Sequence, residues 1–147
     1  MKHVLFVCTG NTCRSPLAEA MLLHKKDQGI EVRSAGVYAA DGVPPSLETL
    51  EVLKEKSISY EKTSSLLTKD MVDWADIILT MTVAHKQTSV SMYPFAADKI
   101  YTLHEFALDD KNRDIIDPIG ADTEVYRQTA AEIERLMDYA LPKIKSL

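Results

Sequence analysis

Short apolar runs alternate with amphipathic segments along this chain. Four runs rich in apolar and β-branched residues predict buried strands at residues 3–7, 31–36, 76–81 and 99–103. Segments with helical spacing or helix-start signals predict helices that begin near residues 15, 45, 69, 83 and 123. This alternation predicts an α/β fold, in which helices cover both faces of a four-stranded parallel sheet.

Residues at the segment ends predict where several helices start and stop. Ser15 is expected to cap the first helix, with Pro16 at its first position and Gly29 closing it. Thr68 is expected to cap a short helix that runs through Trp74. A long loop is expected between the fourth strand and residue 123, where the last helix begins.

The spacing of apolar residues also predicts which sides of two helices are buried. The helix that opens at Pro45 is expected to carry Leu47, Leu50 and Leu53 on one side. For the last helix, which has Pro142 near its end, the expected buried residues are Val125, Thr129, Ile133, Leu136, Met137 and Ala140.

Composition fits one small domain that spans residues 1–147. The chain is 46% hydrophobic and has no linker, repeat or low-complexity tract. Its net charge of −5 gives no basic face, so nucleic acid and anionic membranes are poor candidate partners. Because there is no membrane-length apolar run, no leader sequence and only two cysteines, we expect a cytoplasmic protein with reduced thiols.

The segment from Cys8 to Ser15 joins the first predicted strand to the first predicted helix. It has the form Cys-x5-Arg-Ser and contains Gly10. Backbone N–H groups of such a loop converge with the helix N-terminus on one point, which favours an anion. The segment therefore predicts a phosphate cradle around a nucleophile, to which Thr9, Thr12 and Cys13 also contribute.

Each side chain of this segment has an expected role. The helix N-terminus and Arg14 are expected to lower the pKa of Cys8, so that much of it is thiolate at neutral pH. The guanidinium of Arg14 can bind two phosphoryl oxygens at once. Ser15 is placed to donate a hydrogen bond to the sulfur, and Asn11 can hold the loop shape.

No metal site or cofactor is expected. The spacing of Cys8 and Cys13 is not that of a zinc motif, and the four histidines form no ligand pair.

A carboxylate is expected at the same edge of the sheet, because ligands of parallel sheets bind at the carboxyl ends of the strands. The loop after the fourth strand contains Asp117, whose backbone is restrained by Pro118. Asp117 could give a proton to the leaving atom and then take one from the attacking water. Asp109, Asp110 and Asp114 occupy the same loop and are alternatives.

At these residues the chain resembles the low-molecular-weight protein tyrosine phosphatase family, from Val4 to about Leu141. The signature VCTGNTCRSPLAEA and the late Asp-Pro loop carry the resemblance. It implies a flavodoxin-like fold and a phosphocysteine intermediate on Cys8, with Arg14 as the clamp and Asp117 as acid and then base. Cys13 resembles the second cysteine of the family, which can form a reversible, protective disulfide with Cys8. A buried, merely structural Cys13 is the alternative.

Three residues bear on the substrate. CTGNTCRS, with Thr12 in place of a bulky apolar residue, resembles the bacterial protein arginine phosphatases. Ile119 stands where tyrosine-specific members tend to carry aromatic residues, although it also departs from the Phe common in arginine phosphatases. Tyr38 could line one wall of the pocket or be ordinary loop packing. The resemblance implies phosphoarginine in proteins as substrate and a protein arginine kinase as opponent in bacterial stress signalling, with phosphotyrosine as the alternative.

Three other functions share parts of this signature. Thioredoxin-coupled arsenate reductases need further cysteines, and none follows Cys13. A phosphocysteine carrier should slow hydrolysis, so Arg14 and Asp117 would be unexpected in it. A catalytically inactive binder of phosphorylated proteins would not need Cys8, Arg14 and Asp117 together.

Overall fold

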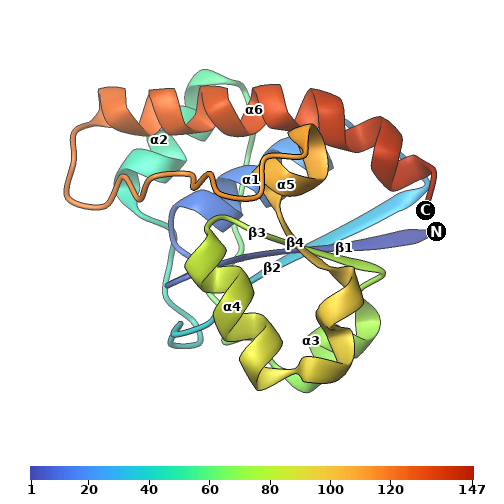
Figure 1. The fold of residues 1–147 in the computed structure, drawn as a ribbon. Coiled ribbons are helices and arrows are strands. Elements are labelled where there is room, and N and C mark those ends of the chain that lie inside the picture. The colour runs from blue at the N-terminus through green and yellow to red at the C-terminus, as the bar shows by residue number, and fades with distance from the viewer.

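The computed structural model describes residues 1–147 and contains one four-stranded sheet between two groups of helices (Figure 1). The strands are β1 (Lys2–Cys8), β2 (Ile30–Gly36), β3 (Ile77–Thr80) and β4 (Ile100–Thr102). They are all parallel and lie in the order β2-β1-β3-β4, which confirms the predicted sheet. The loop after β1 therefore opens at the carboxyl edge of a central strand.

Six α-helices and one 3-10 helix connect and cover the strands. They are α1 (Arg14–His24), α2 (Leu47–Glu55), α3 (Lys69–Trp74), α4 (Val83–Met92), η1 (Pro94–Lys99), α5 (Leu103–Leu108) and α6 (Thr123–Lys145). The predicted cap of α3 is confirmed, because Thr68 accepts a hydrogen bond from the N–H of Met71. The bounds of α4 and the start of α6 are also as predicted. No helix combines the length and apolar character needed to cross a membrane.

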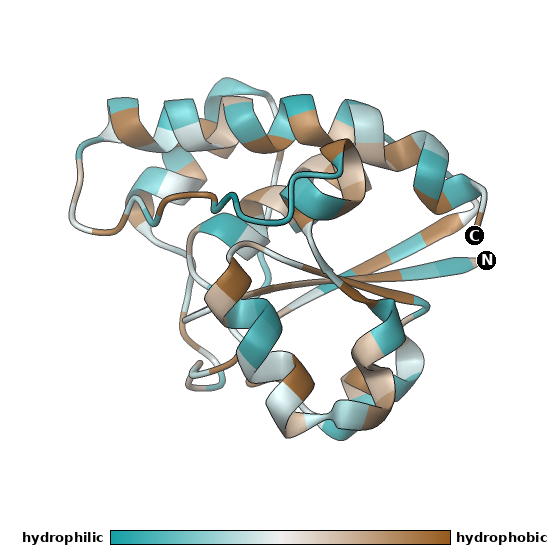
Figure 2. Ribbon diagram, viewed as in Figure 1, coloured by the Kyte–Doolittle hydropathy of each residue, from teal (hydrophilic) through white to brown (hydrophobic).

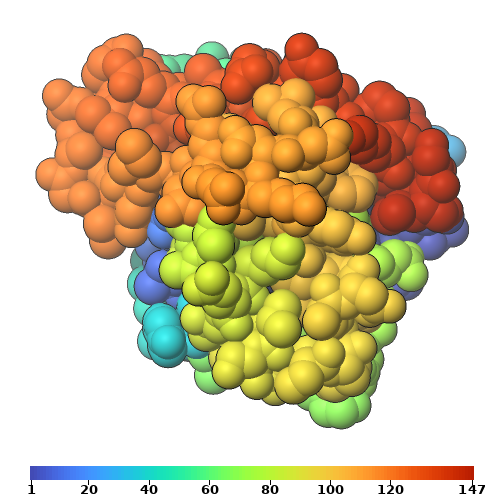
Figure 3. All heavy atoms as spheres, in the orientation of Figure 1, coloured from blue at the N-terminus to red at the C-terminus, as the bar shows by residue number.

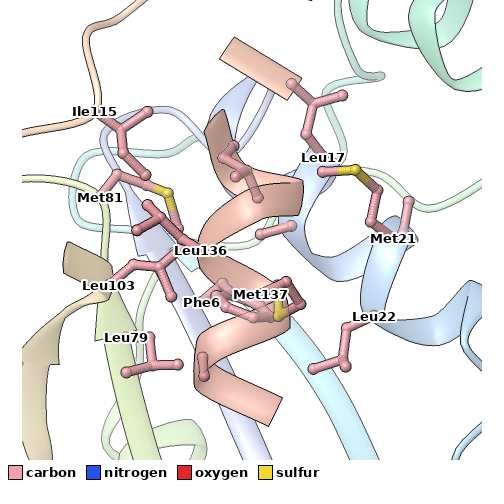
Figure 4. Close-up of a cluster of buried hydrophobic side chains, with 14 of the residues drawn as sticks. Phe6, Leu17, Met21, Leu22, Leu79, Met81, Leu103, Ile115, Leu136 and Met137 are labelled. Atoms are coloured by element: carbon pink, nitrogen blue, oxygen red, sulfur yellow. The ribbon is translucent and has the colours of Figure 1, made fainter. Parts of the chain in front are cut away.

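The sheet separates two hydrophobic cores because successive side chains of a strand point to opposite faces. Val4 and Phe6 of β1 face the larger core, and Leu5 and Val7 face the smaller one beside α3 and η1. Figure 4 shows Phe6 beside Met137 of α6 in the larger core, to which Leu17, Met21 and Leu22 of α1 also belong. In Figure 2 the middle of the sheet is hydrophobic, while much of the outer side of α6 is hydrophilic.

Both predicted ends of α1 are wrong. The helix begins at Arg14, and the Ser15 hydroxyl does not cap it because that oxygen lies 2.8 Å from Sγ of Cys8. The helix ends at His24, before Gly29. Lys26 takes the left-handed conformation that follows the helix, with φ of 53°.

The fourth strand is shorter than predicted, and the segment after it is not one long loop. Thr102 ends β4 and caps α5, and its backbone N–H is bound in return by the side chain of Glu105. This reciprocal capping box starts a helix at Leu103. The loop to α6 therefore begins only at Asp109.

The predicted buried side of α2 is wrong at Leu47, which is 81% exposed. Leu53 is buried as predicted, and Leu50 is partly buried. Thr49 and Val52 are buried in addition, and the hydroxyl of Thr49 turns inward to the carbonyl oxygen of Thr12. In α6, Val125 is only partly buried, while the predicted burial is confirmed for Thr129, Ile133, Leu136, Met137 and Ala140.

Candidate active site

The loop after β1 surrounds a pocket of about 130 Å³ at the carboxyl edge of the sheet. Its lining comes from this loop, the start of α1 and the segment before α6, and consists of Cys8, Thr9, Gly10, Thr12, Cys13, Arg14, Asp117 and Ile119. The fold therefore brings a thiol, a guanidinium and a carboxylate to one pocket from two distant parts of the chain.

The sulfur of Cys8 is buried and surrounded by hydrogen-bond donors. The backbone N–H of Asn11 donates to it at 3.3 Å. The Oδ1 atom of Asn11 accepts from the N–H of Ser65, so its Nδ2 is the donor to Oγ of Ser15 at 2.8 Å. Since the Ser15 oxygen accepts there, its own hydrogen is free to point at the Cys8 sulfur, as expected from the sequence.

Burial raises the pKa of the Cys8 thiol above its ordinary value. The hydrogen bonds from Ser15, the charge of Arg14 and the N–H of Asn11 lower this pKa, but by less than burial raises it. The expected large share of thiolate at neutral pH is therefore not supported. The stabilising neighbours of Cys8 are visible in the sequence, whereas the desolvation of its sulfur is a property of the folded chain.

Buried polar groups behind the loop fix its shape. Asn11 has a positive φ of 57°, and its Nδ2 also donates to the hydroxyl of Ser34. Ser34 in turn donates to the buried carboxylate of Glu19, which also accepts from Tyr60 and pairs with Lys62. Sequence reasoning identified Asn11 but missed Ser34 and Glu19, because only the fold brings these positions together.

Gly36 is required where β2 passes beside the loop. A Cβ atom at this position would lie 2.4 Å from the carbonyl oxygen of Thr9 and 3.0 Å from the backbone nitrogen of Asn11. Both neighbours are backbone atoms that cannot move without changing the loop. The close approach of strand and loop therefore depends on the absence of a side chain.

The guanidinium of Arg14 is buried and is held by groups from two loops. Its Nη1 donates to the carbonyl oxygen of Ile115 at 2.9 Å. Its Nη2 lies 3.5 Å from Oγ1 of Thr9 and 3.5 Å from Oδ2 of Asp117. These contacts fix the plane in which Arg14 can bind two phosphoryl oxygens.

Among the aspartates of the segment before α6, only Asp117 lines the pocket. Its Oδ1 accepts a hydrogen bond from the N–H of Ile119, and its side chain is 41% exposed. Asp114 binds the N–H of Val83 at the start of α4, and Asp109 ends α5. In Figure 3, orange atoms of this segment lie against the yellow-green atoms of α4. The geometry favours Asp117 over its neighbours as a proton carrier.

The structure separates Cys13 from Tyr38. Cys13 is a free thiol that lines the pocket and lies 3.5 Å from the hydroxyl of Tyr126. Tyr38 is 73% exposed and lines a different, more open hollow with residues of α4. It is not brought to the pocket wall.

His85 is a residue of this site that the sequence reasoning missed. Its Nε2 lies 2.7 Å from Oγ1 of Thr9, behind the catalytic loop. Burial, with a smaller contribution from the charge of Arg14, lowers the pKa of His85 to about 4. His85 is therefore neutral at neutral pH. Nothing in the sequence points to it, because the contact joins α4 to the loop after β1.

Comparisons with known proteins identify the family of this chain. The model of the family "Low molecular weight phosphotyrosine protein phosphatase" matches residues 3–146. A protein-arginine-phosphatase from Geobacillus stearothermophilus is 47% identical over 144 residues, which are 98% of this chain and 97% of the relative. The low molecular weight protein-tyrosine-phosphatase PtpB of Staphylococcus epidermidis is 39% identical over 92% of this chain and 94% of its own length.

Two solved structures extend the likeness to the fold. The YwlE arginine phosphatase from Geobacillus stearothermophilus superposes with a TM-score of 0.96 at 46% identity, covering 99% of this chain and 94% of that one. A cysteine-to-serine mutant of YwlE arginine phosphatase with a phosphorylated active site serine has a TM-score of 0.92 at 37% identity, covering 97% and 95%. This chain belongs to the low molecular weight protein tyrosine phosphatase family and, like its relatives, is a phosphatase.

Proposed function

We propose that this protein removes phosphate from phosphoarginine residues of proteins, with Cys8 as nucleophile. The observation that carries the choice of arginine is the pocket lining, which includes Thr12 and Ile119 but no aromatic side chain. A phenol ring gains most from aromatic or bulky apolar walls. A charged guanidinium gains more from hydrogen bonds to the Thr12 hydroxyl and to a carboxyl oxygen of Asp117.

In the first step, the sulfur of Cys8 attacks phosphorus. Because burial raises the pKa of the thiol, its proton passes to an oxygen of the bound phosphoryl dianion as the substrate enters. The S–P bond then forms and the P–N bond breaks, and its electron pair stays on the guanidine nitrogen. Protonated Asp117 gives that nitrogen a proton. Arg14 and the loop N–H groups bind the phosphoryl oxygens.

In the second step, water hydrolyses the phosphocysteine. The carboxylate of Asp117 takes a proton from water, and the water oxygen attacks phosphorus. The S–P bond breaks, and its electron pair returns to the sulfur of Cys8, which the Ser15 hydroxyl and the Asn11 N–H stabilise. Inorganic phosphate leaves. The phosphorylated serine in the mutant YwlE structure supports covalent transfer to the corresponding side chain.

The setting of this activity is also part of the proposal. A protein arginine kinase would oppose the enzyme in bacterial stress signalling in the cytoplasm, as the family resemblance implies. Cys13 lies in the same pocket as Cys8. A peroxide-type oxidant that takes two electrons and two protons from the two thiols would join them in a disulfide and so protect the nucleophile from irreversible oxidation.

Phosphotyrosine is the second candidate substrate. The exposed side chain of Ile119 stands beside Asp117 at the pocket and offers an apolar surface to a phenol ring. The name of the Staphylococcus epidermidis relative supports the same candidate.

The deciding experiment compares kcat/KM for phosphoarginine and phosphotyrosine within peptides of otherwise identical sequence. We expect the phosphoarginine peptide to be the better substrate and Cys8→Ser to abolish turnover of both. A higher kcat/KM for the phosphotyrosine peptide would overturn the choice of arginine. Turnover that survives in Cys8→Ser would overturn the proposed nucleophile.

A further inference from the structure

His85 makes a polar contact with the loop after β1 through one atom and does not line the pocket. The side chain comes from the first turn of α4 and is 7% exposed. Its Nε2 lies 2.7 Å from Oγ1 of Thr9, whereas its Nδ1 is buried without a hydrogen-bond partner. The contact with Thr9 is therefore the one hydrogen bond of the imidazole ring.

The neighbouring guanidinium favours one assignment of the hydrogen-bond roles in this contact. Arg14 can only donate, so the Thr9 oxygen accepts from Nη2 of Arg14, which is 3.5 Å away. The Thr9 hydroxyl hydrogen is then free to point to Nε2 of a neutral His85. The charged groups that face the imidazole are Arg14, Asp114 and Asp117.

We propose that His85 is a positioning residue for phosphoryl transfer. It accepts a hydrogen bond from the Thr9 hydroxyl and thereby keeps the Thr9 oxygen turned toward Arg14. Without His85, the hydroxyl can rotate toward the pocket, and Arg14 loses one of the groups that fix its plane. The proposal rests on phosphatase chemistry at Cys8 and Arg14 and does not depend on arginine as the substrate.

A positioning role predicts a larger loss for the transition state than for the bound substrate. With p-nitrophenyl phosphate, we expect His85→Leu to lower kcat about tenfold, the effect of roughly one lost hydrogen bond to a polar neighbour, with KM changed less than about twofold. Inhibition by vanadate, which resembles the transition state, should weaken by a similar factor, and inhibition by phosphate should change less.

His85→Gln and Ser89→Ala are the matched variants. Gln can place an amide near the position of Nε2, so we expect His85→Gln to recover most of kcat. Ser89 lies one turn further along the same helix, and its buried hydroxyl has no partner, so Ser89→Ala should leave kcat unchanged. Melting temperatures of all variants separate loss of folded protein from loss of rate.

Thr9→Val tests the contact from its other side, in case His85→Leu does not fold. We expect the His85→Leu, Thr9→Val double variant to lose little more than Thr9→Val alone. Full kcat in folded His85→Leu, independent losses in the double variant, or no recovery by Gln would overturn the proposal. A preference for phosphotyrosine would overturn the proposed substrate and leave the His85 effect on p-nitrophenyl phosphate in place, so the two failures are distinguishable.

Discussion

Oδ2 of Asp117 lies 3.5 Å from Nη2 of Arg14, although the two residues are far apart in the sequence. The guanidinium is buried, whereas the carboxylate is 41% exposed at the pocket. Arg14 can therefore bind the phosphoryl group, while Asp117 faces the leaving group and solvent.

The first prediction concerns this carboxylate. Asp117→Asn keeps the size of the side chain but cannot exchange a proton, so we expect kcat to fall about 10² to 10⁴-fold. Steady-state assays with phosphoarginine peptides measure the change. Asp110→Asn is the matched control, because Asp110 lies in the same segment and does not line the pocket. Equal rates of Asp117→Asn and the unmodified protein would contradict the proposed acid and base.

The second prediction concerns the protonation of Cys8. The Ser15 hydroxyl lowers a pKa that burial has raised, so Ser15→Ala should raise the pKa further. Only the thiolate reacts with iodoacetamide. We therefore expect the curve of alkylation rate against pH to move to higher pH in Ser15→Ala. A curve that stays in place or moves to lower pH would show that Ser15 does not stabilise the sulfur anion.

The third prediction concerns the passage of β2 beside the loop. Gly36→Ala forces a Cβ atom against the Thr9 carbonyl oxygen. We expect an overpacking cost of about 1 to 3 kcal/mol in the free energy of unfolding, with a lower kcat because the loop must shift. Thermal or urea unfolding and steady-state assays measure the two effects. Gly29→Ala, whose Cβ would meet only the Asp27 side chain at 3.3 Å, should retain kcat.

The fourth prediction concerns substrate choice. Thr12→Ile replaces a hydroxyl in the pocket lining with an apolar group. We expect the ratio of kcat/KM for phosphoarginine over phosphotyrosine peptides to fall about tenfold or more, since the loss of one hydrogen bond and the gain of apolar contact act in the same direction. Thr12→Ser, which retains the hydroxyl, should keep the ratio. An unchanged ratio in Thr12→Ile would remove Thr12 from the account of specificity.

Much of the sheet and of the pocket followed from local sequence patterns. The apolar run before Cys8 and the Cys-x5-Arg signal lie within a few residues of each other, so one strand-loop-helix unit places both Cys8 and Arg14. Asp117 was likewise predicted from its neighbour in the sequence, because Pro118 directly follows it and restrains its backbone. The capping box at Thr102 is also a local signal, but it overlaps the apolar run that ends at Leu103, and that run predicts a strand.

What the sequence could not supply were contacts between distant segments. Leu47 is exposed, and the side of α2 that carries Thr49 faces inward, where the Thr49 hydroxyl binds the carbonyl oxygen of Thr12. The spacing of apolar residues along the helix cannot predict this contact. His85 reaches Thr9 only when α4 packs beside the loop. Burial of the Cys8 sulfur, which reverses the expected direction of its pKa, is likewise a property of the folded chain.

The most direct test is to identify the atom that carries phosphate during turnover. Asp117→Asn should slow hydrolysis of the intermediate. This variant is allowed to react with a phosphoarginine protein and is quenched without acid. Mass spectrometry should then find phosphate on Cys8. The same experiment with Cys8→Ser as a second substitution should find no phosphocysteine. Continued release of phosphate from phosphoarginine with no phosphate on Cys8 at any quench time would contradict the account.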